Sequence, residues 1–296
     1  MSDFAERPEV QRDANPEIIL KTLKLHLEKS FERLRGEDRC AVLFSGGVDS
    51  ALAALMARNY CEDTLLITAR CAGSHDERVA VSAAKDMSLP IIEVHIDSDS
   101  LWKTLPKVVN TIKRTKRMDV EIALPFFFAA QEAHNRGYNL IVSGQGPDEL
   151  FGGYARYEKM MIDHGPEKVE SELWADVSIT DEANIQRDTL AVGAHGLEAF
   201  FPYLHQEFAR TALTIPATLN INPEKKPSRK LLFRELALQL GVPKEVALTP
   251  KRATQYSSGT SKMLEKTIRK NVSSMKELTK KELHLAIQEF LDSLVL

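Results

Sequence analysis

Hydrophobic residues in the first half of the chain form short apolar runs separated by stretches with helical spacing. The pattern predicts strands at 41–44, 64–69, 91–96 and 139–143, and helices at 49–59, at 75–88 and within 99–136. The strand runs are apolar on both faces, which is typical of a parallel sheet covered by helices on both sides. Ligands bind beyond the carboxyl ends of such strands, so we expect the loops after the first, second and fourth strands to carry the chemistry.

The rest of the chain reads as helical. Pro16 opens a helical pattern to about Arg35, after a flexible tail at 1–15. Strand alternation stops after about residue 165, and the last helix begins with a capping box formed by Thr279 and Glu282. We therefore expect an α/β nucleotide-binding unit over 16–165 and a helical part over 166–296 that packs on it.

Composition narrows the class of protein. With 296 residues, 43% hydrophobic and 27% charged, the chain resembles ordinary globular proteins, and its net charge of −3 argues against binding to a nucleic acid backbone. Cys40, Cys61 and Cys71 form no C-x-x-C pair, so neither a disulfide framework nor a zinc site is indicated. No run approaches the length needed to span a bilayer and no signal peptide is evident, so we expect a cytoplasmic protein without membrane contact.

The first candidate site is the loop Ser45-Gly46-Gly47-Val48-Asp49-Ser50, between a predicted strand and a predicted helix. Adjacent glycines let a ligand approach the main chain closely, and the helix N-terminus presents N–H groups to an anion. Ser45 and Ser50 add hydroxyl donors, while Asp49 suits a metal ion. The loop therefore predicts a phosphate site, with an ordinary strand-to-helix turn as the plainer alternative.

The second candidate site is Leu140 to Tyr157, where a strand again enters a glycine-bearing acidic loop. In a parallel sheet this loop lies at the same edge as the first one. Asp49 and Asp148 are then expected to face a common Mg²⁺ ion, the usual partner of a polyphosphate. Ser143 and Gly144 would bring backbone groups close to a nucleobase or ribose. The plainer alternative is a glycine-rich turn with helix-capping acids.

These two loops resemble those of a known family. The first is similar to the S-G-G-x-D-S loop of enzymes that cleave ATP between the α and β phosphates. The second, Gly144 to Tyr154, resembles the G-E-G-x-D-E-[LV]-F-G-G-Y loop in the synthetase domain of asparagine synthetases and the related β-lactam synthetases. Shorter matches follow in the family's order, at 72–76, at Arg187 with 194–204, at 230–235, and at 246–251 with 255–259.

The resemblance implies a fold and a reaction. The fold is a doubly wound parallel five-stranded sheet of the adenine nucleotide alpha hydrolase type, with a helical C-terminal layer. The reaction uses ATP and Mg²⁺ to convert a small-molecule carboxylate, aspartate or a relative, into an acyl-adenylate and pyrophosphate, and ammonia or an amine then attacks the carbonyl. The resemblance places Leu43 and Ala69 around adenine, and makes Lys251 the catalytic lysine, with Arg252 as a rival.

Two positions depart from the family pattern. Gln145 stands where the family has the glutamate that takes a proton from ammonia, and a carboxamide is no base near neutral pH. Either Glu149, His75 or a water does this work, or the nucleophile or substrate differs. Within Glu198-Ala199-Phe200, an apolar residue holds the position of the family's arginine.

A further departure concerns the nitrogen source. Typical asparagine synthetases begin with a glutaminase domain whose nucleophile is a cysteine after the initiator methionine, whereas this sequence has Ser2 there. We expect no glutaminase activity in this chain, and free ammonia, a separate glutaminase subunit or another amine as the donor. A tRNA-modifying enzyme and a non-catalytic nucleotide-binding or regulatory protein remain as alternatives. The oligomeric state stays open, with a homodimer as one option.

Overall fold

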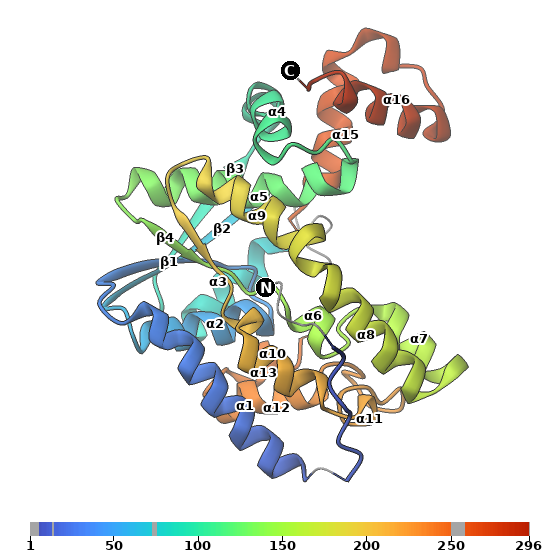
Figure 1. Cartoon of the computed structure of the whole chain (residues 1–296). Coiled ribbons are helices and arrows are strands. Elements are labelled where there is room, and N and C mark those ends of the chain that lie inside the picture. Colours follow the sequence, from blue (N-terminus) through green and yellow to red (C-terminus); the bar gives the residue numbers. More distant parts are fainter. Residues whose placement is uncertain (1–5, 14, 73–75, 250–257, 296) are drawn as a thin grey trace.

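The structure is a computed structural model and describes residues 6–13, 15–72, 76–249 and 258–295. Its centre is one sheet of five strands: β1 (Arg39–Leu43), β2 (Asp63–Cys71), β3 (Ile91–Ile96), β4 (Leu140–Val142) and β5 (Glu198–Phe200). The order across the sheet is β3-β2-β1-β4-β5, and every neighbouring pair is parallel (Figure 1). The predicted doubly wound, five-stranded parallel sheet is thereby confirmed.

The fifth strand lies where no strand was expected. The hydrophobic pattern after residue 165 predicts only helices, but β5 pairs with β4. Leu140 lies opposite Glu198, and Val142 lies opposite Phe200. The expectation was wrong at this point because three residues with an exposed end carry too little hydrophobic pattern to be recognised. The division of the chain into parts at residue 165 stays a prediction.

Helices cover both faces of the sheet. One apolar cluster holds side chains of α1 (Pro16–Phe31), α2 (Val48–Arg58), α3 (Asp76–Asp86), α10 (Gln206–Leu213), α12 (Leu231–Gln239) and α13 (Lys244–Ala247). A second holds α4 (Ser98–Ile112), α5 (Arg117–Asn135), α9 (Gln186–Gly193), α15 (Thr260–Asn271) and α16 (Lys280–Asp292). Strand β1 contributes side chains to both clusters, because successive residues of a strand point to opposite faces of the sheet. Cys40 and Val42 belong to the first cluster and Ala41 to the second.

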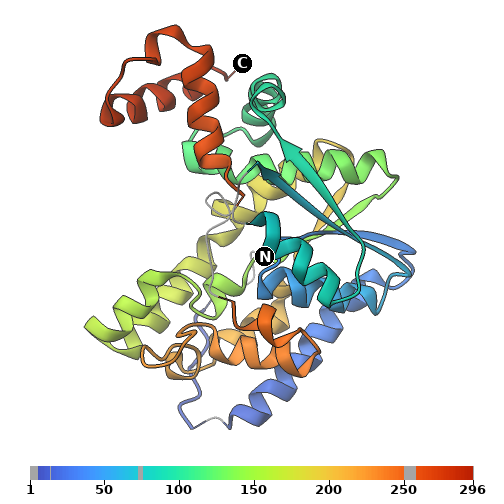
Figure 2. The ribbon, with the colours of Figure 1, turned by 180° about the vertical axis from the view of Figure 1, so that it is seen from behind.

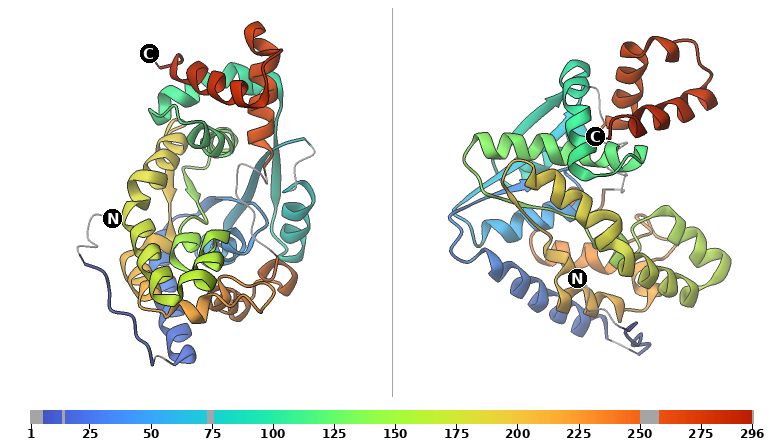
Figure 3. Two further views of the ribbon diagram at one scale, coloured as in Figure 1. Left: turned by 90° about the vertical axis from the view of Figure 1, so that its right-hand side faces the viewer. Right: turned by 45° about the horizontal axis from the view of Figure 1, so that its top comes forward.

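The remaining elements lie beside the sheet. They are α6 (Pro147–Leu150), α7 (Ala155–His164), α8 (Pro166–Thr180), α11 (Ala217–Asn220), a π-helix at Asp181–Ile185, and 3-10 turns at Glu32–Leu34, Pro202–Leu204 and Ser273–Met275. Figure 2 shows α15 and α16 at the end of the molecule opposite α1, and Figure 3 agrees from two further directions. Within the described residues, no helix is both long enough and apolar enough to cross a membrane.

Several helix ends follow local sequence signals. Helix α1 begins at Pro16, where the Asn15 side chain accepts a hydrogen bond from the backbone of Glu17, as expected of a cap. Helix α16 has the predicted capping box, in which the Thr279 hydroxyl and the Glu282 carboxylate each satisfy a backbone N–H.

In the segment before α1, Arg12 donates two hydrogen bonds of 2.7 Å to Glu170 of α8.

The loop after β1 needs glycine at one position because α3 crosses it closely. Gly46 has a φ of +76°, and a Cβ built there would lie 2.8 Å from backbone atoms of Ala80. Backbone atoms of a packed helix cannot move aside as a flexible side chain can. This contact fixes the path of the loop.

We predict that Gly46→Ala loses at least about 2 kcal/mol of unfolding free energy, from backbone strain and the clash together. Gly241→Ala is the matched control, because Gly241 has a φ of +90° with no atom within 4 Å of the added Cβ. The control should lose only about 1 kcal/mol, the strain alone. Urea unfolding measures both, and equal losses would contradict the role of Ala80.

Candidate active site

The site lies where the strand order of the sheet reverses. From β1 the chain moves outward through β2 and β3, then returns to β4 on the other side of β1. The loops after β1 and β4 therefore leave the same edge on either side of the reversal, which is where open α/β sheets bind ligands. They touch at Gly144, where an added Cβ would lie 2.9 Å from the backbone nitrogen of Ser50.

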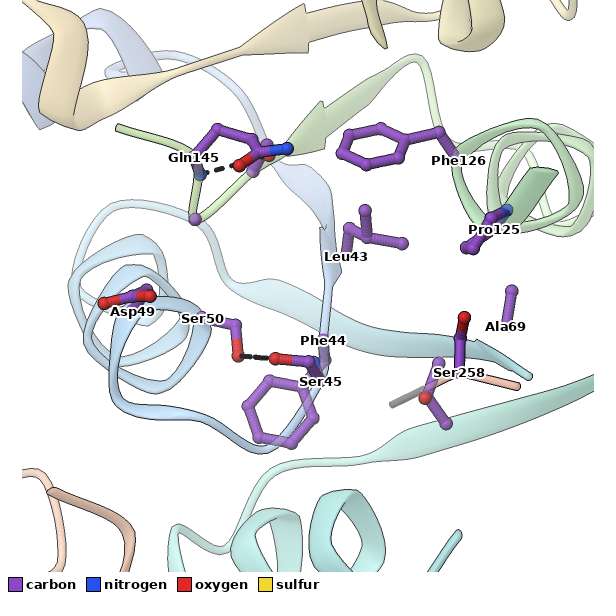
Figure 4. Close-up of a pocket in the computed structure, with 13 residues that line it drawn as sticks. Leu43, Phe44, Ser45, Asp49, Ser50, Ala69, Pro125, Phe126, Gln145 and Ser258 are labelled. Carbon is purple, nitrogen blue, oxygen red and sulfur yellow. Dashed lines mark hydrogen bonds between the residues drawn. The ribbon is translucent and has the colours of Figure 1, made fainter. Parts of the chain in front are cut away.

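A pocket with about 570 Å³ of atom-free space, part of it open to solvent, lies between these loops. It is lined by Leu43, Phe44, Ser45, Asp49, Ser50, Thr68, Ala69, Pro125, Phe126, Ser143, Gly144, Gln145 and Ser258 (Figure 4). The structure thus brings together every residue predicted to bind the nucleotide except Gly46 and Gly47, which lie in the same loop. The contacts of all these residues with a ligand stay predictions.

One side of the pocket is polar. The Ser45 and Ser50 hydroxyls lie 3.2 Å apart, and the Ser50 hydroxyl donates to the carbonyl of Gly47 at 3.1 Å. Gly47 is the N-cap of α2, and within the described residues no side chain of the N-cap bonds to the first turn of this helix. An open helix N-terminus flanked by hydroxyls is suited to an anion such as phosphate.

The other side is apolar. Leu43, Ala69, Pro125 and Phe126 lie away from the Ser45–Ser50 pair in Figure 4, with Ser258 beside Ala69. Sequence analysis found Leu43 and Ala69 by resemblance but missed the two residues from α5. Their segment, Ala123 to Ala130, is continuously apolar and buried, so nothing in it distinguishes a pocket wall from core. An apolar wall facing a phosphate-type loop fits a molecule with a flat apolar end and an anionic end.

A buried lysine joins the two aspartates that were expected to share a metal ion. The Nζ atom of Lys230 lies 2.8 Å from both carboxylate oxygens of Asp49 and 2.6 Å from Oδ1 of Asp148. The lysine side chain is only 1% exposed. Sequence analysis placed Lys230 in a matched helix motif and gave it no role, because the partners of a lysine cannot be read from its neighbours in sequence.

Gly153 makes room for this cluster. A Cβ at Gly153 would lie 1.9 Å from Oδ1 of Asp148 and 2.2 Å from Cε of Lys230. The glycine therefore lets two buried charged groups approach the main chain, a use distinct from permitting an unusual turn.

The cluster fits a hard cation as well as a lysine. Two carboxylates converge on the point that Lys230 occupies, and the buried guanidinium of Arg234 also interacts electrostatically with both of them. Carboxylate oxygens are the ligands that Mg²⁺ prefers. No group of three or more His, Cys, Asp or Glu residues suited to a metal occurs in the described part of the chain. A metal on Asp49 and Asp148 would take its other oxygens from water or a phosphate.

Gln145 makes a contact that sequence analysis did not anticipate. Its Nε2 donates to Oδ2 of Asp188 at 3.0 Å, and Arg187 donates from Nε to Oδ1 of the same carboxylate at 2.8 Å. Arg187 also donates to Asp119 of α5 at 3.1 Å. Burial raises the pKa of Asp188, and the guanidinium of Arg187 opposes this rise. The motif match at Arg187 thereby gains a structural role, that of a buried cation between two carboxylates.

A second pocket adjoins the first one at Gln145. It is lined by Lys116, Met118, Ile122, Gln145, Asp148, Glu149, Tyr154, Arg156, Asp176, Ile179, Ala183, Asn184 and Arg187. In its wall, the Tyr154 hydroxyl donates to Glu149 at 2.5 Å. Burial, followed by the neighbouring Asp148 carboxylate, raises the pKa of Glu149 to about 7. A pKa of about 7 suits a group that transfers protons near neutral pH.

Other predicted residues have different outcomes. Lys251, Arg252 and His75 lie outside the described residues. Phe200, two residues after Glu198 and therefore at the position of the family's arginine, lies in β5 opposite Val142 and packs, partly buried, against the first apolar cluster.

The family model described as Asn_synthase (Asparagine synthase) matches residues 22–171 and 161–295. The chain belongs to the asparagine synthase family. A Methanocaldococcus jannaschii protein named "Putative asparagine synthetase [glutamine-hydrolyzing] 1" is 33% identical over 292 residues, covering 89% of this chain and 52% of that protein. An asparagine synthetase [glutamine-hydrolyzing] of Sandersonia aurantiaca is 27% identical over 226 residues, covering 71% of this chain and 42% of that protein.

This asparagine synthase-family chain thus spans about half the length of these relatives. Among solved structures, an NMN synthetase from Francisella tularensis is similar at 15% identity and a TM-score of 0.43, covering 95% of this chain and 87% of that chain.

We predict that Lys230→Met lowers the unfolding free energy by about 3 kcal/mol or more in metal-free buffer, because it leaves two buried carboxylates without a cation. Added Mg²⁺ should restore part of the loss by occupying the same point. Lys29→Met, which removes an exposed pair with Glu207, is the control and should cost less than about 1 kcal/mol. Urea unfolding with and without Mg²⁺ measures this, and a loss insensitive to Mg²⁺ would contradict the cation site.

Glu149 should make stability depend on pH. Its pKa is raised from an ordinary value of 4.5 to about 7, so between these values the native protein holds a proton that the unfolded chain releases. Its contribution to stability is therefore greatest below about pH 4.5 and is lost as the pH rises toward 7. Urea unfolding in metal-free buffer measures the slope of the unfolding free energy against pH. Glu149→Gln should lose the slope between pH 4.5 and 7, whereas the control Glu62→Gln, at an exposed position, should keep it. A wild-type slope in Glu149→Gln would refute the assignment.

Proposed function

We propose that this chain is an ATP-dependent, amide-forming ligase of the asparagine synthetase type. The observation that carries the proposal is the meeting of the Ser45–Ser50 loop and the Gly144–Glu149 loop at one pocket, with Asp49 and Asp148 sharing Lys230. Membership in the asparagine synthase family supports an ATP-dependent amidation. Aspartate or a related carboxylate is the proposed substrate.

In the first step, a carboxylate oxygen of the substrate attacks the α-phosphorus of ATP and displaces pyrophosphate. Leu43, Ala69 and Phe126 hold the adenine in the apolar part of the pocket. The N–H groups at the start of α2, with Ser45 and Ser50, bind the departing pyrophosphate. Lys230 is paired with Asp49, a residue of the pocket wall, and is proposed to stabilise the negative charge that develops.

Asp49 and Asp148 are the residues that would hold Mg²⁺, which when bound neutralises phosphate charge. Lys251, or its neighbour Arg252, is proposed to stabilise the charged transition states. Both assignments rest on the family's motifs and on the carboxylate chemistry described above.

In the second step, ammonia or an amine attacks the acyl-adenylate carbonyl and releases AMP. The second pocket, which shares Gln145 with the first, offers the nucleophile a place beside the activated carbonyl. Glu149 is the proposed proton acceptor, in place of the glutamate absent at Gln145. Free ammonia and ammonia delivered by a separate glutaminase subunit are both compatible with this arrangement.

A non-catalytic nucleotide-binding role is the second candidate. It is favoured by Gln145, because a carboxamide held by Asp188 cannot act as the base. The two candidates differ in one measurement, since a binding protein would retain ATP without exchanging pyrophosphate.

The test is an ATP–pyrophosphate exchange assay across candidate carboxylates, followed by amide formation with ammonium chloride or glutamine. We expect exchange with aspartate or a relative, and we expect Asp49→Asn to reduce it at least about 100-fold because one of the two carboxylates proposed to hold Mg²⁺ is lost. Asp163→Asn, at an exposed position of α7, is the control. Exchange with no carboxylate would refute the ligase proposal.

A further inference from the structure

Gln145 lies between the two pockets of the site and lines both. Its side chain has two chemically different ends, a donor Nε2 and an acceptor Oε1. Which end faces a ligand decides whether the residue recognises an acceptor or an N–H donor. The contact behind Gln145 answers this question.

That contact is a buried carboxylate. Asp188 has no exposed surface, and its Oδ2 receives the Gln145 amide at 3.0 Å. Its other oxygen, Oδ1, accepts a hydrogen bond of 2.8 Å from Nε of Arg187, and this positive charge favours the ionised form of the carboxyl. An ionised carboxylate only accepts hydrogen bonds, so it binds the NH₂ end of the amide and rejects the carbonyl end.

The carboxylate is itself held rigidly. Arg187 is 1% exposed and also donates to Asp119 of α5, so the chain Gln145–Asp188–Arg187–Asp119 joins the loop after β4 to two helices. A π-helix at Asp181–Ile185 immediately precedes α9, the helix that carries Arg187 and Asp188, and such segments recur at functional sites.

We propose that Asp188 is a positioning residue that fixes the Gln145 amide so that its Oε1 is the atom available to a ligand. Oε1 then accepts a hydrogen bond from an N–H group, which makes ammonia or a primary amine the ligand recognised at this point. Within the described part of the chain, Oε1 makes no other hydrogen bond that would compete. The inference rests on the proposed ligase function and assigns its second step a specific contact.

The same contact explains why a carboxamide suits position 145. A glutamate there would bring a second carboxylate within hydrogen-bonding distance of Asp188, in a site with no exposed surface on one side. Two carboxylates this close cannot both stay ionised without a large cost. The identities of residues 145 and 188 are therefore coupled, although 43 positions separate them.

The test compares variants of Asp188 and Asp119, the two carboxylates that accept hydrogen bonds from Arg187. Asp188→Asn and Asp119→Asn each remove one anionic partner of Arg187, but only Asp188→Asn presents an NH₂ group to Gln145 and allows the amide to turn. The measured quantity is the ratio of amidation to ATP–pyrophosphate exchange, with ammonium chloride as the nitrogen donor. We expect the ratio to fall about tenfold in Asp188→Asn, through a higher KM for ammonium, the effect of one misdirected hydrogen bond. Asp119→Asn should stay within about twofold of wild type.

Exchanging the two groups provides the rescue. Gln145→Glu alone should lower the same ratio, because two carboxylates then face each other. Gln145→Glu combined with Asp188→Asn should recover it at least partly, because the Asn NH₂ then donates to the new carboxylate. Should Asp188→Asn not fold, Gln145→Met removes the amide without disturbing the ion pairs, and its ratio should also fall about tenfold.

Equal ratios in Asp188→Asn and Asp119→Asn, no recovery in the double variant, or an unchanged ratio in Gln145→Met would overturn the inference while leaving the ligase intact. Absence of exchange in the wild-type chain with every carboxylate would instead refute the ligase and this inference with it.

Discussion

The interaction on which the site depends is the ion pair of Lys230 with Asp49 and Asp148. It joins three segments that are distant in sequence: the start of α2, the start of α6 and the residue before α12. Because all three charges are buried, each requires the others, and the pair ties the C-terminal helices to the two loops at the sheet edge.

Around this cluster the site divides into two chemical environments. The first pocket combines an apolar wall with the N-terminus of α2, and these features suit a ligand with an apolar end and an anionic end. The second pocket holds the titratable groups, with Glu149 in a buried contact with Tyr154. Gln145 lines both pockets, and its hydrogen bond to Asp188 orients its side-chain amide. Where the family has a glutamate, this chain thus has an amide hydrogen-bonded to a buried carboxylate.

The sheet topology explains why two loops 100 residues apart in the chain form one site. The reversal of strand order between β1 and β4 leaves a crevice at their carboxyl ends, which both loops enter. Gly144 and Gly46 let the backbone of these loops pack against neighbouring helices at distances no other residue allows. Strand β5 completes the sheet from the helical half of the chain, so the sheet extends across the boundary predicted at residue 165.

The sequence by itself determined the strands β1 to β4, the two glycine loops, the start of α1, the cap of α16 and the parallel class of the sheet. These features depend on residues within a few positions of one another, where periodicity, glycine and capping groups act directly. Only the tertiary structure decided that Lys230 bridges the aspartates, that Asp188 holds Gln145, that Phe126 forms a pocket wall and that residues 198–200 form a strand. Each of these depends on groups brought together across long stretches of chain, and a charged or apolar residue looks the same in sequence whether its partner is solvent, core or another buried charge.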